Sequence, residues 1–314
     1  MFSFGFDAVF GELPSKIHPV VIIGSIINFF KKYLIKIRNR WSGFLLYILC
    51  IITVSLILFI IYLIFENFVI LFILMFLILL SSTFSFKMLI NTAINVKNDL
   101  NESIEKARKS VSYLVSRNTD ELTEEFIVSA TIESLSENIT DSFIAPIFYY
   151  FIFASVILIT PIHYQLYFLL LIPMIYRISN TLDAMVGYEN DELKYIGFFP
   201  AKVDDILNFI PSRIAGLYVV LSAYLLGYDG KNSFKIMRRD ARNCPSPNSG
   251  YTMATTAGAL DIQLIKKETY ILGDNIKNIE TSDISNAVKL TKLTLILFIL
   301  TIILLLLTLI YVIL

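Results

Sequence analysis

Long apolar runs divide this chain into alternating apolar and charged segments, and they constrain its fold more than any other feature. The apolar runs cover residues 44–65, 69–86, 143–160, 164–176 and 293–314. All 26 Lys and Arg residues lie outside them, in segments 1–43, 87–142 and 177–292. Because about 20 apolar helical residues cross the hydrocarbon core of a bilayer, the first and last runs are long enough to span it. The sequence therefore predicts an integral membrane protein.

The composition agrees with a location in the lipid bilayer. Apolar residues make up 56% of the chain and the mean hydropathy is +0.70, more than one core of a soluble domain needs. The formal net charge is zero, so there is no electrostatic case for nucleic acid as a partner. Of the two cysteines, one lies within a predicted span, so we expect no disulfide framework.

The placement of basic residues predicts which segments face the cytoplasm. The links at residues 65–68 and 161–163 contain no Lys or Arg, so the positive-inside rule places them outside the cell. The three basic segments are then cytoplasmic. Pro146 and Pro173 interrupt the third and fourth runs, which leaves open two short spans or a helical hairpin that enters the membrane and returns.

A further apolar stretch, residues 214–227, follows Pro211. Because 14 residues are short for a span, we expect a re-entrant or buried helix here, with Pro211 ending the helix before it. The predicted fold is a single domain over residues 1–314, an all-α integral membrane protein. It has about five membrane-inserted helical segments with long, partly helical cytoplasmic loops, and the predicted location is the cell membrane.

An acidic stripe precedes the third apolar run. Glu133, Glu137 and Asp141 recur every four residues, so on a helix they lie along one face. A parallel stripe carries uncharged polar side chains (Ser134, Asn138 and Ser142), and the opposite face is apolar (Ile132, Leu135, Ile139 and Phe143). Neighbouring like charges repel, and a divalent cation such as Mg²⁺ would offset this repulsion because it prefers carboxylate and amide oxygens. A solvated acidic face is the alternative.

Two further polar clusters follow on predicted helices. Asn180 and Asp183 are three residues apart and share a face, although an ordinary helix start capped by Asn180 or Thr181 explains them equally well. Asp204 and Asn208 share another face, and Asp205 lies beside them. Adjacent aspartates again favour a metal or a cationic partner.

Arg213 and the turn-rich segment from Ser246 to Tyr251 are candidates for anion binding. Turn residues with exposed N–H groups beside basic side chains hold phosphate or carboxylate, which gives Ser246 and Asn248 a potential role. The alternatives are ordinary turn chemistry for the segment and an interfacial, snorkelling position for Arg213.

Together these motifs resemble one known family. The strings ESLSENITDSFIAPIFYY, NTLDAMVGY, KVDDILNFIPSR and SPNSGYTMATTAGAL, in this order behind GELP and HPV, are similar to the adenosylcobinamide-phosphate synthase family of cobalamin biosynthesis. The resemblance runs over nearly the whole chain. It implies a membrane enzyme that joins adenosylcobyric acid to the amine of (R)-1-amino-2-propanol O-phosphate, or of ethanolamine phosphate, with consumption of ATP.

This chemistry assigns expected roles to the polar clusters. An acyl phosphate made from ATP would activate the corrinoid carboxylate, with Mg²⁺ or another divalent cation neutralising the phosphates. The expected metal ligands are Glu133, Glu137, Asp141, Asp183 and Asp204. The expected catalytic residues are Glu137, Asp205 as proton acceptor, and Arg213. Further expected binding residues are Arg117 for phosphate, together with Asn138, Asn180, Asn208, Ser246 and Asn248.

The resemblance has departures and rivals. The family pattern starts with a longer apolar stretch before Asp7. It has an acidic residue at the position of Asn118, a histidine near the position of Cys244, and an acidic residue at the position of Met253.

A catalytically silent membrane sensor on the same scaffold and a corrinoid transporter remain rival functions. The expected partners are the two substrates, ATP and the lipid bilayer, and further candidates are other membrane enzymes of cobalamin assembly and a second copy of the chain.

Overall fold

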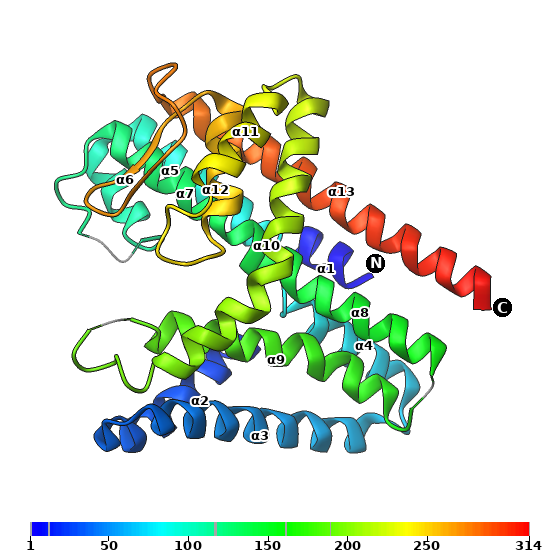
Figure 1. Ribbon diagram of the computed structural model, residues 1–314. Helices are drawn as coiled ribbons and strands as arrows, with labels where there is room; N and C mark the ends of the chain where they lie inside the picture. Colours follow the sequence, from blue (N-terminus) through cyan, green and yellow to red (C-terminus); the bar gives the residue numbers. More distant parts are fainter. Residues whose placement is uncertain (1, 12, 116–117, 161, 189, 314) are drawn as a thin grey trace. The chain divides into compact units, whose positions relative to one another are not determined.

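The computed structural model describes residues 2–11, 13–115, 118–160, 162–188 and 190–313 (Figure 1). It is 76% helical, and its only strands in the described residues are three residues long, which confirms the predicted all-α class. The elements are α1 (Phe2–Phe10), α2 (Pro19–Leu34), η1 (Ile35–Ile37), α3 (Arg40–Phe65), α4 (Val69–Ser81), α5 (Lys87–Glu102), α6 (Ile104–Val111), α7 (Glu124–Ile139), η2 (Thr140–Ile144), α8 (Ala145–Ile159), α9 (Gln165–Val186), α10 (Phe198–Leu226), α11 (Gly230–Asp240), α12 (Gly250–Leu260), β1 (Leu264–Lys266), β2 (Tyr270–Leu272) and α13 (Thr281–Ile313).

The chain forms two compact units that interleave along the sequence. The first unit comprises Met1–Ser85, Ala145–Leu207 and Ile303–Leu314, and the second comprises Phe86–Ile144 and Asn208–Ile302. The first contains the apolar helices α3, α4, α8 and α9, and the second contains the polar segments together with parts of α10 and α13.

In the first unit, α3 packs against α9 and α2. The hydroxyl groups of Tyr47 and Ser179 share a hydrogen bond of 2.9 Å within this interface. Gly43 allows the segment before α10 to approach α3, because a Cβ atom at this position would lie 2.3 Å from the Ile196 carbonyl oxygen. His18 caps α2 by accepting a hydrogen bond from the Val20 N–H at 3.2 Å, so this histidine has a structural role.

Five helical stretches are long and apolar enough to cross a membrane, counted over the described part of the chain: Arg40–Phe65, Glu124–Ile159, Gln165–Val186, Phe198–Leu226 and Thr281–Ile313. This agrees with a membrane protein that has about five membrane-inserted segments. The apolar run at residues 69–86 gives a shorter helix, which ends at Ser81. The run at residues 164–176 is the first part of α9, which continues through Pro173 to Val186.

The prediction that Pro211 ends a helix is wrong. Pro211 lies inside α10, and residues 214–226 are the second part of this 29-residue helix rather than a separate short one. Proline cannot donate the hydrogen bond that the carbonyl four residues earlier would accept. That carbonyl belongs to Leu207, and the Tyr149 hydroxyl donates to it at 2.7 Å. A side chain thus satisfies the group that proline leaves open, as helices in membranes require.

In the second unit, α7 lies at the centre and packs against α5, α6, α12 and the β1–β2 hairpin. Its predicted apolar face is confirmed, since Ile132, Leu135, Ile139 and Phe143 are all buried. The hairpin pairs Lys266 with Tyr270 and is attached to α7 by the Ile265 N–H, which donates to Ser129 Oγ at 3.2 Å. This attachment brings the hairpin to the acidic face of α7.

The α-helical periodicity of α7 ends at Ile139, where the five-residue π-helix η2 begins. Glu133 and Glu137 lie on the regular part of the helix, whereas Asp141 lies in η2. A π-helical turn contains more residues than an α-helical turn. The predicted four-residue spacing therefore holds for Glu133 and Glu137 and is interrupted before Asp141.

Candidate functional site

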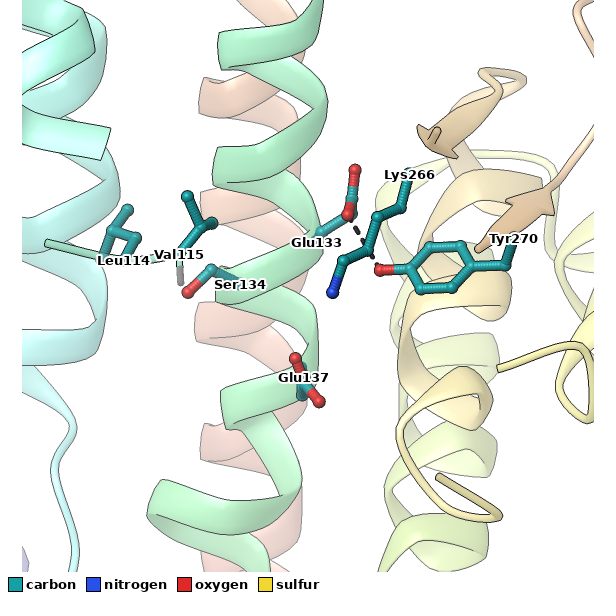
Figure 2. Close-up of a pocket in the computed structure, with 7 residues that line it drawn as sticks. All are labelled: Leu114, Val115, Glu133, Ser134, Glu137, Lys266 and Tyr270. Carbon is teal, nitrogen blue, oxygen red and sulfur yellow. Dashed lines mark hydrogen bonds between the residues drawn. The ribbon is translucent and has the colours of Figure 1, made fainter. Parts of the chain in front are cut away.

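Glu133 is buried on α7 and is held by two hydroxyl groups. Glu133 is only 5% exposed. Ser129 Oγ donates to Glu133 Oε1 at 2.7 Å, and the Tyr270 hydroxyl donates to Glu133 Oε2 at 2.8 Å (Figure 2). Both oxygens of this carboxylate accept a hydrogen bond, which fixes the orientation of the group. The second stripe is also ordered, because Ser142 Oγ donates to Asn138 Oδ1 at 2.9 Å.

A cavity of about 110 Å³ lies beside these groups. Glu137, one turn after Glu133, borders the same cavity, and the lining residues are Leu114, Val115, Glu133, Ser134, Glu137, Lys266 and Tyr270. Figure 2 shows the Lys266 side chain extending into the space between α7 and Tyr270. The cavity thus combines two carboxyl groups, one ammonium group and two hydroxyl groups. Its volume suits an ion with a few waters or a single functional group, since sites for whole small molecules measure about 300–1,000 Å³.

The environment keeps Tyr270 in its protonated form. Burial raises the pKa of Tyr270 above its ordinary value of 10.0, and the negative charge of Glu133 raises it further. A protonated phenol is the form that donates to Glu133. Since the folded-state pKa is raised, this stabilising contribution is complete below pH 10 and is lost only as the pH rises through the folded-state value.

We therefore expect Tyr270→Phe to destabilise the protein by about 1–3 kcal/mol, because it leaves one oxygen of a buried carboxylate without its donor. The measurement is the thermal midpoint in detergent at neutral pH. Tyr311→Phe is the control, since Tyr311 is 84% exposed near the end of α13. Equal midpoints for the Tyr270→Phe variant and the unchanged protein would contradict a stabilising role for this hydrogen bond.

A larger cavity of about 440 Å³ is also bordered by Lys266. Its wall contains the next lysine as well, Lys267, whose ammonium group lies 4.7 Å from the centre of the Phe126 ring. Thr123, Thr269 and Asn118 add polar groups, and Glu121 is the single acidic residue in the lining. The size falls within the range of small-molecule sites, and the two lysines favour an anionic ligand.

The structure brings two predicted anion-binding residues, Arg213 and Asn248, together in the second unit. Arg213 Nη1 donates to Asn248 Oδ1 at 3.0 Å and to the Phe209 carbonyl oxygen at 2.5 Å. The guanidinium also lies over two rings, 3.6 Å from the centre of Phe209 and 4.3 Å from that of Tyr251. Ser246 supports this loop, since its Oγ accepts a hydrogen bond from the Asn248 N–H at 3.3 Å.

Most of the remaining predicted site residues lie on α9 and α10. Asn180 and Asp183 lie inside α9, so the alternative that Asn180 or Thr181 begins a helix is wrong. Asp204 and Asp205 lie on α10 in the first unit, where Lys202 Nζ donates to Asp205 at 3.3 Å, and Asn208 is buried on α10 in the second. Arg117 lies outside the described residues. A site that joins these residues to Glu133 and Glu137 stays a prediction.

The donor groups fit a magnesium ion that is held only partly by protein. No three His, Cys, Asp or Glu side chains in the described ranges are grouped so that they could hold a metal ion together. Mg²⁺ commonly keeps several waters and binds through one or two carboxylates plus substrate phosphates. Glu133 and Glu137 beside one small cavity match this mode.

Comparison with known proteins shows which family the chain belongs to. The sequence model described as "CobD/Cbib protein" matches residues 1–291. The chain belongs to the CobD/Cbib family. It is similar to proteins named "Probable cobalamin biosynthesis protein CobD", with 45% identity to that of Methanothermobacter thermautotrophicus (91% of this chain, 89% of the relative) and 43% to that of Methanococcus aeolicus (85% and 84%). The "Cobalamin biosynthesis protein CobD" of Listeria monocytogenes is 34% identical (92% and 91%). No solved structure matches.

In this CobD/Cbib chain, two departures from the family pattern lie in apolar surroundings. Met253 is 1% exposed and Cys244 is 7% exposed, and both belong to the hydrophobic core that includes Ile132 and Leu135 of α7. Burial raises the pKa of the Cys244 thiol to about 12, so it stays uncharged at neutral pH. Met253 instead contacts the Tyr270 hydroxyl, with its sulfur 3.7 Å from the oxygen. Neither position offers a group for proton transfer at neutral pH.

Sequence reasoning did not identify Lys266, Tyr270 or Tyr251 as candidate site residues. The first two lie on a hairpin of three-residue strands about 130 residues after the glutamates, and such short strands give no alternating pattern. Tyr251 directly follows the recognised SPNSG segment, so its aromatic ring beside a turn was an available signal. Membership of the CobD/Cbib family places the whole set in a cobalamin biosynthesis protein.

Proposed function

We propose that this protein forms the amide bond between adenosylcobyric acid and an amino alcohol phosphate, either (R)-1-amino-2-propanol O-phosphate or ethanolamine phosphate, with consumption of ATP. The product is adenosylcobinamide phosphate or its ethanolamine analogue. Membership of the CobD/Cbib family supports the pathway. The observation that carries the proposal is the small cavity in which Glu133 and Glu137 meet Lys266, because phosphoryl transfer needs both metal-binding oxygens and a cation.

The proposed reaction has two balanced steps. A carboxylate oxygen of the corrinoid attacks the terminal phosphorus of ATP, so an acyl phosphate forms and ADP leaves. The amine nitrogen then attacks the acyl carbon, the C–N bond forms, inorganic phosphate leaves, and a base takes the proton of the amine. Mg²⁺, when bound, supplies charge neutralisation for the phosphates.

Each residue has a proposed task in this scheme. Glu133 and Glu137 would hold the metal, with Asp141 as a further proposed ligand, and Lys266 faces the transferred phosphoryl group. Roles for Asp183 and Asp204 as metal ligands stay predictions from the sequence. Asp205 stays the residue that the sequence predicts as acceptor of the amine proton. Arg213, already oriented by Asn248, binds a phosphate or carboxylate group. The cavity beside Lys267 has the volume for the phosphate-bearing part of a substrate.

The direct test is an assay with purified protein in detergent. It contains adenosylcobyric acid, one of the two amino alcohol phosphates and Mg-ATP, and product is detected by mass spectrometry. We expect the amide to appear together with ADP and phosphate in a 1:1:1 ratio. Omission of Mg²⁺ should stop the reaction. Failure to form any amide with either amine, in protein whose fold is verified, would reject the proposal and favour a non-catalytic sensor.

A further inference from the structure

The exposed face of α11 carries a cluster of basic side chains around one aromatic ring. Lys231, Phe234, Lys235 and Arg238 are exposed and, with Arg239, line a groove of about 420 Å³. Residues 231, 235 and 238 recur at intervals of four and three, so they lie along one stripe of the helix. We call Lys231, Phe234, Lys235 and Arg238 the basic face of α11.

Among the described residues, three of these four cations have no ion-pair partner. Arg239 is already ion-paired, because its guanidinium lies 2.6 Å from Asp240 and 2.8 Å from Asp274. Lys231, Lys235 and Arg238 make no ion pair within the part of the chain that the structure describes. Three like charges close together repel one another. An anionic ligand outside the chain would offset this repulsion.

The rest of α11 fixes the direction in which the basic face points. Its opposite side packs on α12, where Ser233 Oγ donates to the Thr255 carbonyl oxygen at 2.9 Å and Asn232 Nδ2 donates to the Gly258 carbonyl oxygen at 3.1 Å. Asp229 caps the helix by accepting from the Asn232 N–H at 2.8 Å. The helix therefore cannot rotate to hide Lys231, Lys235 and Arg238 without breaking this contact.

The basic face begins where an apolar helix ends. α10 is one of the helices able to cross a membrane, and its last turns expose apolar side chains at Leu221, Tyr224 and Leu225. α11 starts four residues after Leu226 (Figure 1). The junction is tight, because a Cβ atom on Gly230 would lie 2.6 Å from the Tyr224 ring. The first turn of α11 is therefore held against the last turns of α10, beside the exposed apolar side chains of that helix.

We propose that the basic face of α11 binds the phosphate groups of anionic membrane lipids at the membrane surface beside the last turns of α10. The lysine and arginine side chains contact the phosphates, and Phe234 inserts among the upper parts of the acyl chains. Lipid phosphate is the source that fits, because exposed apolar side chains of α10 lie next to the first turn of the basic face. Basic residues next to a membrane helix attract anionic lipid by about 1 kcal/mol each, which corresponds to roughly fivefold in affinity per residue.

The test measures lipid binding to the full-length protein in detergent by native mass spectrometry. Dioleoylphosphatidylglycerol is the anionic probe and dioleoylphosphatidylcholine is the zwitterionic probe. We expect the unchanged protein to prefer the anionic lipid and to lose most of this preference at high salt. The variant Lys231→Gln/Lys235→Gln/Arg238→Gln should lose roughly 10- to 100-fold of the preference.

The control carries the same change of charge elsewhere. Lys16→Gln/Lys109→Gln/Lys289→Gln alters three exposed lysines in separate segments of the chain, and its preference should stay within about twofold of the unchanged protein. Equal binding of the two lipids by the unchanged protein would overturn the proposal. So would an equal loss in both triple variants, or an unaltered preference in the α11 variant, which would point to an acidic protein as the ligand of this face.

Discussion

Replacing Glu137 by Gln is expected to lower the rate of amide formation by about 10²–10³-fold, the scale observed when one electrostatic group of a transition-state site is removed. Glutamine keeps the shape of the side chain and removes its charge. Glu137 borders the cavity with Lys266, whereas its neighbour Glu133 is the residue that ties the hairpin to α7. The loss should therefore appear in catalysis, with little change in folding. The measurement is the initial rate of product formation by mass spectrometry.

Two additional measurements make the Glu137→Gln result specific. The Mg²⁺ concentration for half-maximal rate should rise, because the variant offers one carboxylate fewer. Glu125→Gln is the matched control, since it removes the same charge from an exposed position in the first turn of the same helix. A Glu137→Gln rate within twofold of normal would exclude the residue from the metal site, and a similar loss in both variants would indicate a general effect of charge.

The second large effect is on folding, at Gly250, the first residue of α12. A Cβ atom there would lie 2.1 Å from the Ala241 carbonyl oxygen and 2.8 Å from the carbonyl carbon, both backbone atoms that cannot rotate away. Gly250→Ala therefore forces the start of α12 away from the segment after α11. We expect a loss of about 3 kcal/mol in stability. The thermal midpoint in detergent should fall, and less monodisperse protein should be recovered.

Gly5→Ala provides the matched control for Gly250→Ala. Gly5 also lies in a helix, and a Cβ atom there has no neighbour within 4 Å among the described atoms. Alanine at an unobstructed helical position costs nothing sterically and favours the helix by roughly 0.5–1 kcal/mol. If both variants melted at the same temperature as the unchanged protein, the close approach of α12 to the Ala241 carbonyl would not be a constraint on folding.

The helical architecture could be predicted from the sequence because it follows from local patterns. The apolar runs contained the cores of the membrane helices, and the 3.6-residue period of α7 identified both its buried face and the Glu133–Glu137 pair. The continuity of α10 could not be predicted in this way. It depends on the Tyr149 hydroxyl, 62 residues before Pro211, satisfying the carbonyl that proline leaves open.

The candidate site was predictable only where its residues share a helix or a motif. Glu133 and Glu137 are one turn apart, but Lys266 and Tyr270 reach them through long-range packing that no local period encodes. Arg213 and Asn248 were identified separately, from their basic and turn-rich surroundings, and their hydrogen bond depends on the tertiary fold. For Asp141 the local pattern was misleading. A regular α-helical period would extend the acidic stripe to this residue, but Asp141 lies in a π-helix.

The enclosure of Arg213 between Phe209 and Tyr251 has a thermodynamic consequence for ligand binding. A free arginine on a surface samples many rotamers and loses about 2 kcal/mol of entropy when an anion immobilises it. Here the two rings and Asn248 already restrict the Arg213 side chain, so most of this entropy is lost during folding and not when an anion binds. Titration calorimetry on the Tyr251→Ala protein should consequently reveal weaker anion binding through a less favourable entropy, with the enthalpy of the charge contact largely retained.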